Sequence, residues 1–251
     1  MSSYSIVFFF ILFASSFGQI DIAKYFKICN RTVQDVNECL VEAIQEGIIA
    51  MSGGIKELGA PPVDPYHQEE IRVEYKNNQI MATMTMKDIY VEGLKLAKVH
   101  NARLRADEDY FHLEVDITTP RVFVRGKYIG EGRYNSLRIN AKGEFNTTMT
   151  DLVYTWKIDG IPEKKNNTTY MRIKSFYMRP DLGNLKAYIS NDNIDSKSII
   201  DFANNFANQN WRPLYREMLP YAQENWNKIG IRIANKIFLK VPYDQLFPEE
   251  M

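Results

Sequence analysis

The residues that could carry out acid–base or metal chemistry are few and scattered along the chain. The carboxylate clusters are Glu69–Glu70 and Asp107–Asp109, and the three histidines are His67, His100 and His112. Paired carboxylates can act as general acid and base, but both clusters lie in polar, loop-like sequence, which favours a solvated surface. His112 alternates with apolar residues and is expected to point to solvent. These residues give no positive support for catalysis.

Sequence motifs with a known catalytic mechanism are absent as well: there is no Gly-x-Ser-x-Gly, P-loop, Gly-x-Gly-x-x-Gly or His-Glu-x-x-His. The glycine-rich run at 126–132 lacks the following helix that a phosphate cradle needs. Met81, Met84 and Met86 are too few for a copper site without histidines, and methionine more often serves as adaptable packing. We therefore predict a protein that is not an enzyme and uses no metal or cofactor, with an uncharacterised hydrolase as the least favoured alternative.

The overall charge narrows the range of partners. The chain has 251 residues, with 31 Lys and Arg against 31 Asp and Glu, and 45% of its residues are hydrophobic. Nucleic-acid binding needs a surplus of positive charge, and so does a polybasic membrane anchor. We expect neither nucleic acid nor a charged membrane surface to be the main partner.

The first segment reads as a targeting signal. An apolar run at Ile6–Phe13 is followed by small residues up to Gly18. The run is shorter than the roughly 20 residues of a membrane span and fits a secretory signal peptide cleaved after Gly18; a signal anchor is the alternative. We predict a cleaved signal at 1–18 and a single domain at 19–251, secreted into haemolymph or another extracellular fluid without stable membrane insertion.

Secretion changes how cysteines and asparagines are interpreted. A bridge between Cys29 and Cys39 would stabilise the fold by roughly 3 kcal/mol in the chain-entropy view, and two buried free thiols are the alternative. Asn-x-Ser/Thr triplets become candidate N-glycosylation sites in a secreted chain. They are Asn30, Asn146, Asn166 and Asn167, of which the last two overlap.

The apolar periodicity divides the chain into helical ends and a strand-rich middle. Thr32–Asp35 resembles a capping box before a helix that Gly53 and Gly54 end. From 71 to 189, apolar residues alternate with polar ones over many short segments, which predicts half-buried antiparallel strands. Glycines at 126, 130, 132, 143 and 160 are expected to punctuate these strands. A long sheet of this kind usually curls around something.

The last quarter predicts what the sheet curls around. An apolar stripe at three-to-four spacing runs from Ile199 to Ile237, which indicates about 40 residues of helix. Pro213 fits the first turn of a segment that begins near Asn210, whereas Pro220 predicts a kink. A helix this long needs a large apolar partner surface, and a curved sheet supplies one.

Several short motifs, in order along about 230 residues, resemble the insect takeout and juvenile-hormone-binding protein family. The early ones are the Cys29–Cys39 pair with Asn37–Leu40, the connection Gly59–Pro65, the strand Met86–Leu94 and the hairpin region Val122–Gly132. The late ones are Asn210–Leu214, Glu217–Pro220, Phe238–Tyr243 and Leu246–Pro248. The chain departs from the family pattern at 189–195 and at Ala141–Gly143.

The resemblance implies an α+β fold in which a strongly curved antiparallel sheet wraps a long, kinked C-terminal helix and encloses an elongated hydrophobic tunnel. It also implies a Cys29–Cys39 disulfide and a secreted, non-catalytic carrier of a juvenile-hormone-like terpenoid or a fatty acid. Feeding, circadian or chemosensory physiology would be the setting. The alternative is a secreted signalling protein with a filled or vestigial tunnel, which would act through an unidentified protein receptor.

Candidate tunnel residues come from both the sheet and the helix, and core packing is the alternative for each of them. Tyr128 or Tyr154 could supply a hydroxyl that orients an ester or epoxide oxygen of the ligand. The candidates are Met84, Phe111, Phe123, Tyr128, Tyr154, Trp156, Phe202, Phe206, Trp211, Met218, Trp226 and Ile233.

Overall fold

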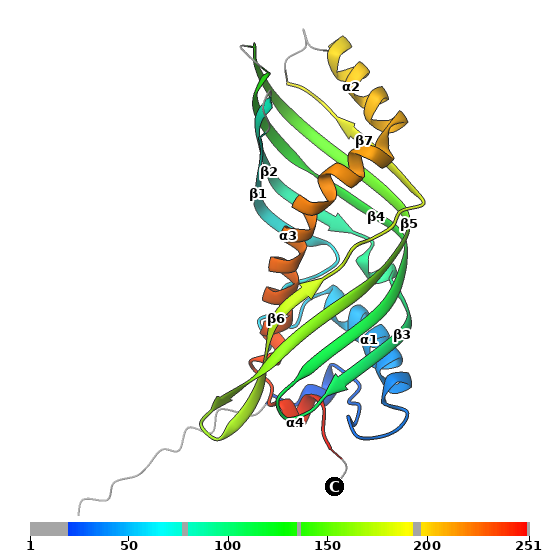
Figure 1. The fold of residues 1–251 in the computed structure, drawn as a ribbon, viewed down its shortest axis with the longest axis vertical. Helices are drawn as coiled ribbons and strands as arrows, with labels where there is room; N and C mark the ends of the chain where they lie inside the picture. The colour runs from blue at the N-terminus through cyan, green and yellow to red at the C-terminus, as the bar shows by residue number, and fades with distance from the viewer. Residues whose placement is uncertain (1–19, 77–79, 135–136, 193–196, 250–251) are drawn as a thin grey trace, which may run out of the picture.

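A computed structural model describes residues 20–76, 80–134, 137–192 and 197–249 (Figure 1). The predicted signal peptide at 1–18 lies outside the described residues. The helices are α1 (Val36–Ser52), α2 (Lys197–Gln209), α3 (Trp211–Phe238) and α4 (Tyr243–Leu246), with short 3₁₀ turns at Ile22–Lys24 and Leu94–Leu96. The strands are β1 (Tyr66–Lys76), β2 (Ile80–Glu92), β3 (Lys98–Ala106), β4 (Phe111–Tyr134), β5 (Leu137–Lys165), β6 (Thr168–Tyr177) and β7 (Asn184–Ile189).

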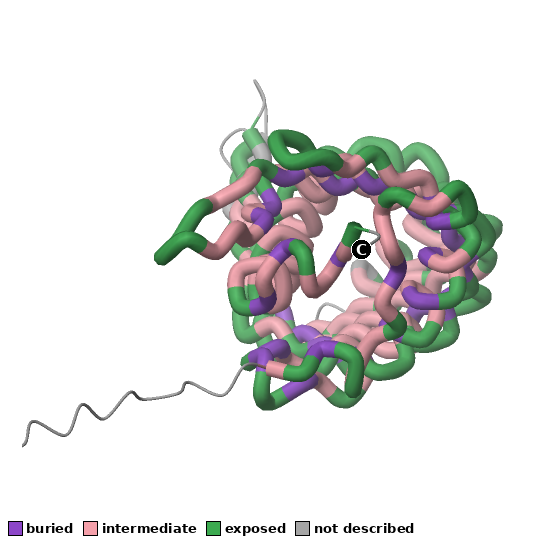
Figure 2. Tube along the Cα trace, turned by 90° about the horizontal axis from the view of Figure 1, so that it is seen from below, coloured by how far each residue is buried: buried purple, intermediate pink, exposed green. Residues whose placement is uncertain are grey.

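All seven strands form one antiparallel sheet around the long pair β4 and β5. The order is β1-β2-β4-β5-β6, with β3 also paired to β4 and β7 to β5. The sheet is strongly curved, and α3 runs along its concave side (Figure 1). Seen along the long axis, the backbone surrounds a central opening (Figure 2). The alternating pattern from 71 to 189 therefore predicts the sheet correctly.

The two long strands exchange neighbours part-way along their length. β4 pairs with β3 through residues 111–118 and with β2 through residues 123–134. β5 pairs with β7 through residues 145–150 and with β6 through residues 157–165. Between the two pairings of β4, Thr119 and Val122 are both buried, so the inward-facing positions shift by one residue. The shift separates a lower half, with β3, β6, α1 and α4, from an upper half, with β1, β2, β7 and α2 (Figure 1).

The glycines expected to punctuate the strands instead lie inside β4 and β5. At Gly126 a Cβ atom would lie 3.0 Å from the Phe145 ring, and at Gly160 it would lie 2.9 Å from the Met171 side chain. These glycines make room for a neighbour's side chain within a continuous strand. Local composition alone does not separate that role from a turn.

The lower half has a packed hydrophobic core. Phe111, Val115 and Ile117 of β4 are at most 1% exposed, and they cluster with residues of α1, α4 and β6. Cys29 and Cys39 form a disulfide at the start of α1. The predicted capping box is not formed, because α1 begins only at Val36 and Asp35 makes no side-chain capping bond.

The C-terminal helix is divided rather than only kinked. α2 ends at Gln209 and α3 begins at Trp211, with Asn210 at the break. Pro213 occupies the first turn of α3, as predicted, while Pro220 lies inside a helix that continues to Phe238. The apolar stripe continues across the break, so periodicity by itself does not reveal it.

Asparagine side chains attach both helices to the sheet edges. Asn204 and Asn208 of α2 each donate to and accept from the backbone of one β7 residue, Ile189 and Ala187 respectively, at 2.8–2.9 Å. In α3, Asn235 does the same to Ile173 of β6, and Asn227 accepts from the Phe176 N–H. The helices thus satisfy backbone groups that an edge strand would otherwise leave unpaired.

Candidate functional site

The candidate site is the inward face of the upper half. Strand pairing places Val73, Met84, Gly130 and Ala141 in one row across β1, β2, β4 and β5. Val124, Met149 and Leu185 continue this face and pack against the lower core. We call this face the upper wall; its residues are Ile71, Val73, Met84, Met86, Val124, Tyr128, Gly130, Ala141, Gly143, Phe145, Thr147 and Met149.

The upper wall is mostly apolar, and along β1 and β2 it is not packed like a core. Met84 is 42% exposed, and Val73, Met86 and Val124 are only half-buried. The opposite face of the same strands is polar, with Arg125 and Lys127 of β4 among its residues. Apolar positions pointing inward without a filled core behind them are what a binding surface for an apolar molecule requires.

Two glycines leave parts of the upper wall without side chains. Gly143 lies opposite Tyr128, and a Cβ at Gly143 would come within 2.4 Å of the Ser190 carbonyl oxygen. At Gly130 the nearest atom to a Cβ is 3.8 Å away. A Cβ added at Gly130 would therefore make only an ordinary van der Waals contact, with the Ala141 carbonyl oxygen, while one at Gly143 would collide.

The two tyrosine hydroxyls proposed for ligand orientation are already engaged. Tyr128 donates to the Ser190 carbonyl at 2.8 Å, and Tyr154 shares a buried 2.9 Å hydrogen bond with Thr119. Burial raises the pKa of both phenols. Both hydroxyls make hydrogen bonds within the protein. The geometry therefore gives no support to the prediction that they orient a ligand oxygen.

A stripe of exposed apolar side chains runs along α2 and the start of α3. Phe202 is 70% exposed and Phe206 49%, and their rings stack with centroids 6.3 Å apart. Leu214 and Met218 continue the stripe at four-residue spacing, 39% and 46% exposed. On α2 the stripe lies away from the asparagines that face β7, because a shift of two residues is about 200° around a helix.

The other residues that the sequence analysis names as tunnel candidates lie in the core, on the polar face of the sheet or at the edge of the core. Phe111 is fully buried against Phe238 and Phe247, which makes it a core residue and corrects its assignment to the tunnel. Phe123 lies between two inward-facing valines and so takes the polar face, beside Glu92 and Thr148. Trp156 and Trp211 pack against the lower core, Ile233 packs against a second cluster around Leu58, and Trp226 is half-buried.

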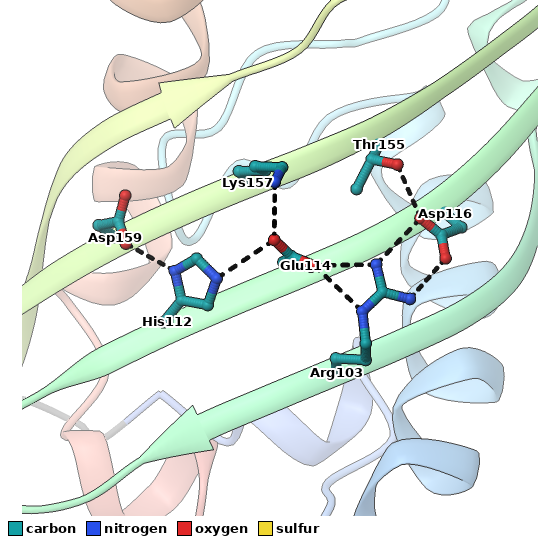
Figure 3. Close-up of polar contacts among 7 residues, drawn as sticks. All are labelled: Arg103, His112, Glu114, Asp116, Thr155, Lys157 and Asp159. Carbon is teal, nitrogen blue, oxygen red and sulfur yellow. Dashed lines mark hydrogen bonds and ion pairs between the residues drawn. The ribbon is translucent and has the colours of Figure 1, made fainter.

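The outer face of the lower half carries a charged cluster that the sequence analysis does not single out (Figure 3). Arg103 bridges Glu114 and Asp116 at 2.9 and 2.6 Å. Hydrogen bonds from Lys157 and Arg103 lower the pKa of Glu114 to about 2, and Arg103 followed by Thr155 does the same for Asp116. The polar residues that alternate with apolar ones along these strands are the sequence signal that could have located the cluster.

His112 lies at the end of this cluster, with Nδ1 2.6 Å from Asp159. The charges are paired with one another, as in a structural network, and none of these residues lines the hollow beside Tyr215 or the one beside Ala141. Within the described ranges, no group of three His, Cys, Asp or Glu residues is placed to hold a metal ion. In the same part of the chain, no helix has the length and apolar character needed to cross a membrane.

Two comparisons concern the sequence and one concerns the fold. The model of the haemolymph juvenile hormone binding protein (JHBP) family matches residues 7–248. The circadian clock-controlled protein daywake of Drosophila yakuba is 23% identical over 218 residues, 84% of each chain, and its Drosophila melanogaster counterpart has the same values. The crystal structure of Epiphyas postvittana Takeout 1 superposes with a TM-score of 0.70 at 20% identity, over 88% of this chain and 99% of that one. The predicted α+β class, a curled antiparallel sheet with a C-terminal helix, is confirmed.

Proposed function

The chain belongs to the haemolymph juvenile hormone binding protein family, and we propose that it is a non-catalytic carrier that holds one small hydrophobic molecule against the upper wall. The observation that carries this proposal is the apolar, half-exposed inner face around Met84. We further propose that the chain is secreted, in keeping with its Cys29–Cys39 disulfide. The related daywake proteins are described as circadian clock-controlled, which makes a rhythmic physiological setting part of the proposal.

The energetics of burial favour a ligand with a long apolar body. Each CH₂ removed from water contributes about 0.8 kcal/mol. A dozen carbons contribute about 10 kcal/mol before the costs of association, and micromolar affinity needs about 8 kcal/mol. A juvenile-hormone-like terpenoid or a fatty acid has that size. An elongated tunnel, closed by the stripe of α2 and α3, is the enclosure that we propose for it.

Native mass spectrometry of the secreted, deglycosylated protein tests the carrier function. The protein is measured as purified, after delipidation, and after addition of juvenile hormone or palmitic acid. A removable mass increment of lipid size, with one ligand per chain, is the expected result. No retained lipid and no rebinding would contradict the carrier and favour the alternative, a signalling protein that acts through a receptor.

Gly130→Leu locates the ligand. Its side chain would project from the upper wall into the space where a Cβ has no neighbour nearer than 3.8 Å, so we expect ligand affinity to fall by about 10- to 200-fold. Thr83→Leu is the matched control, because Thr83 precedes Met84 and takes the opposite face of β2. Equal affinity in the two variants would place the ligand elsewhere.

A further inference from the structure

A hollow of about 340 Å³ lies outside the upper wall, between the segment joining β6 to β7 and the first turns of α3. We call it the arginine pocket. Its lining includes Arg179, Asp181, Trp211, Arg212, Tyr215 and Arg216.

The arginine pocket carries an excess of positive charge. Three guanidinium groups and one carboxylate line it, which leaves a net charge of plus two. Among the described residues, no carboxylate lies within ion-pair distance of Arg179 or Arg216. The Asp181 carboxylate instead accepts a hydrogen bond from the Leu182 N–H at 3.0 Å. By contrast, Arg103 and Arg172 on the sheet each pair with a carboxylate.

The floor and walls of the arginine pocket are held in place. The Tyr215 hydroxyl donates to the Pro180 carbonyl at 2.8 Å and so fastens the β6–β7 segment to α3. Trp211 and Tyr215 are half-buried against the lower core. The Arg212 guanidinium stacks over the Trp211 ring, 4.5 Å from its centroid. A site whose supporting groups are fixed in this way loses little conformational entropy when a ligand binds.

The start of α3 adds positive potential at the same place. Trp211 and Arg212 are the first residues of this 28-residue helix, and Asn210 gives no side-chain capping hydrogen bond. The N-terminal end of a helix carries a partial positive charge and free N–H groups, which favours an anion beside it.

We propose that the arginine pocket binds a phosphate group, either as a soluble phosphate monoester or as a lipid headgroup, through Arg179, Arg212 and Arg216. A phosphate monoester carries a charge of about −1.5 to −2 at neutral pH, which matches the net charge of the lining, whereas a carboxylate carries a single charge. Guanidinium groups bind phosphate oxygens in a bidentate manner. The hollow is larger than a phosphate, so the organic part of the ligand can lie against Trp211.

This site does not depend on the proposed carrier function. Leu214 and Met218, which belong to the exposed stripe, are absent from the lining of the arginine pocket, so the two surfaces use different sides of α3. The Gly130→Leu variant, designed to displace a hydrophobic ligand, is therefore expected to bind phosphate normally.

Isothermal titration calorimetry of the full secreted chain in phosphate-free buffer, first with inorganic phosphate and then with glycerol 3-phosphate, tests the proposal. Co-sedimentation with phosphatidylcholine vesicles, with and without phosphatidic acid, forms the second arm. We expect the double variant Arg179→Gln, Arg216→Gln to lose binding by about tenfold or more per arginine, since hydrogen bonds between charged groups are among the stronger polar contacts. Arg72→Gln on β1, where Arg72 pairs with Glu74, is the matched control.

Binding of the soluble phosphates alone supports a soluble ester as ligand, and binding only to vesicles that contain phosphatidic acid supports a lipid headgroup. The proposal is overturned if neither form binds. It is also overturned if the double variant binds as the unsubstituted protein does while its circular dichroism spectrum shows an intact fold.

Discussion

The two halves of this molecule share β4 and β5 yet differ in what lies behind the same kind of surface. In the lower half, the inward positions of β4 meet α1, α4 and β6, and residues such as Phe111 and Val115 are fully buried. In the upper half, the inward positions are smaller or more flexible, and Met84 stays 42% exposed. Alternation along a strand therefore tells which face is apolar but not whether another element fills it.

The halves also differ in how their glycines and aromatics are combined. In the upper half Phe145 lies over Gly126, and Gly143 leaves room for the Ser190 carbonyl. In the lower half, Phe111 contacts three other aromatic rings, those of Phe238, Tyr243 and Phe247. Large aromatic side chains fill the lower half and stabilise the fold, whereas the glycines of the upper half leave part of its wall accessible.

Truncation of a large side chain should show the contrast most strongly. Phe111→Ala is expected to lower the free energy of unfolding by about 3–5 kcal/mol, because a fully packed site cannot collapse around the cavity. Met84→Ala should cost about 1 kcal/mol or less, since its side chain is already half solvated. Urea denaturation of both variants measures the difference, and similar losses would show that the upper wall is packed after all.

The asparagine attachments offer a second contrast of intermediate size. Asn235→Ala leaves the N–H and carbonyl of Ile173, a residue 1% exposed, without the partners that Asn235 supplies, and we expect a loss of about 2–3 kcal/mol. Asn204→Ala makes the same deletion at the half-buried Ile189, where water can replace the bonds, so about 1 kcal/mol or less is expected. Thermal and urea unfolding of the two variants measure these losses. A larger loss for Asn204→Ala than for Asn235→Ala would contradict the expectation.

The charged cluster of the lower half should produce the smallest effect, and its pH dependence should be confined to the acid range. The folded-state pKa of Glu114 is about 2, below its ordinary value of 4.5, so the carboxylate contributes stability above pH 4.5 that is lost as the pH falls towards 2. Glu114→Gln removes this contribution. The urea midpoint should therefore drop less between about pH 6 and pH 3 in the variant than in the unsubstituted protein, and an equal drop would assign the acid sensitivity to other groups.

The regular parts of the fold could be predicted because they depend on local periodicity. The alternation around Phe111–Ile117, the end of α1 at Gly53 and the place of Pro213 in a first helical turn all follow from spacing and backbone sterics. The break between α2 and α3 at Asn210 could not be predicted, because the apolar stripe continues through it. The pattern also misassigns the glycines of β4 and β5, because a glycine that faces an aromatic ring across a strand pair looks the same in sequence as one that ends a strand.

The candidate site could be predicted only in part, for a similar reason. Met84 and Tyr128, two of the residues expected to line a ligand tunnel, share the inward face of the sheet, but the hydroxyl of Tyr128 donates to the Ser190 carbonyl. The arginine pocket and the Arg103 cluster join residues from segments far apart in the chain. Such groupings depend on strand register and helix docking, which no short window of sequence contains.

The sequence by itself determined the antiparallel sheet, the apolar C-terminal helices and the family, because these depend on the period of hydrophobic residues and on the order of motifs. The tertiary structure decided which apolar faces are filled and which stay open, through the exchange of neighbours along β4 and β5 and the attachment of α2 and α3 to the sheet edges. Burial is a property of what packs on the other side of a surface. For that reason the difference between a filled core and an open apolar wall appears only in three dimensions.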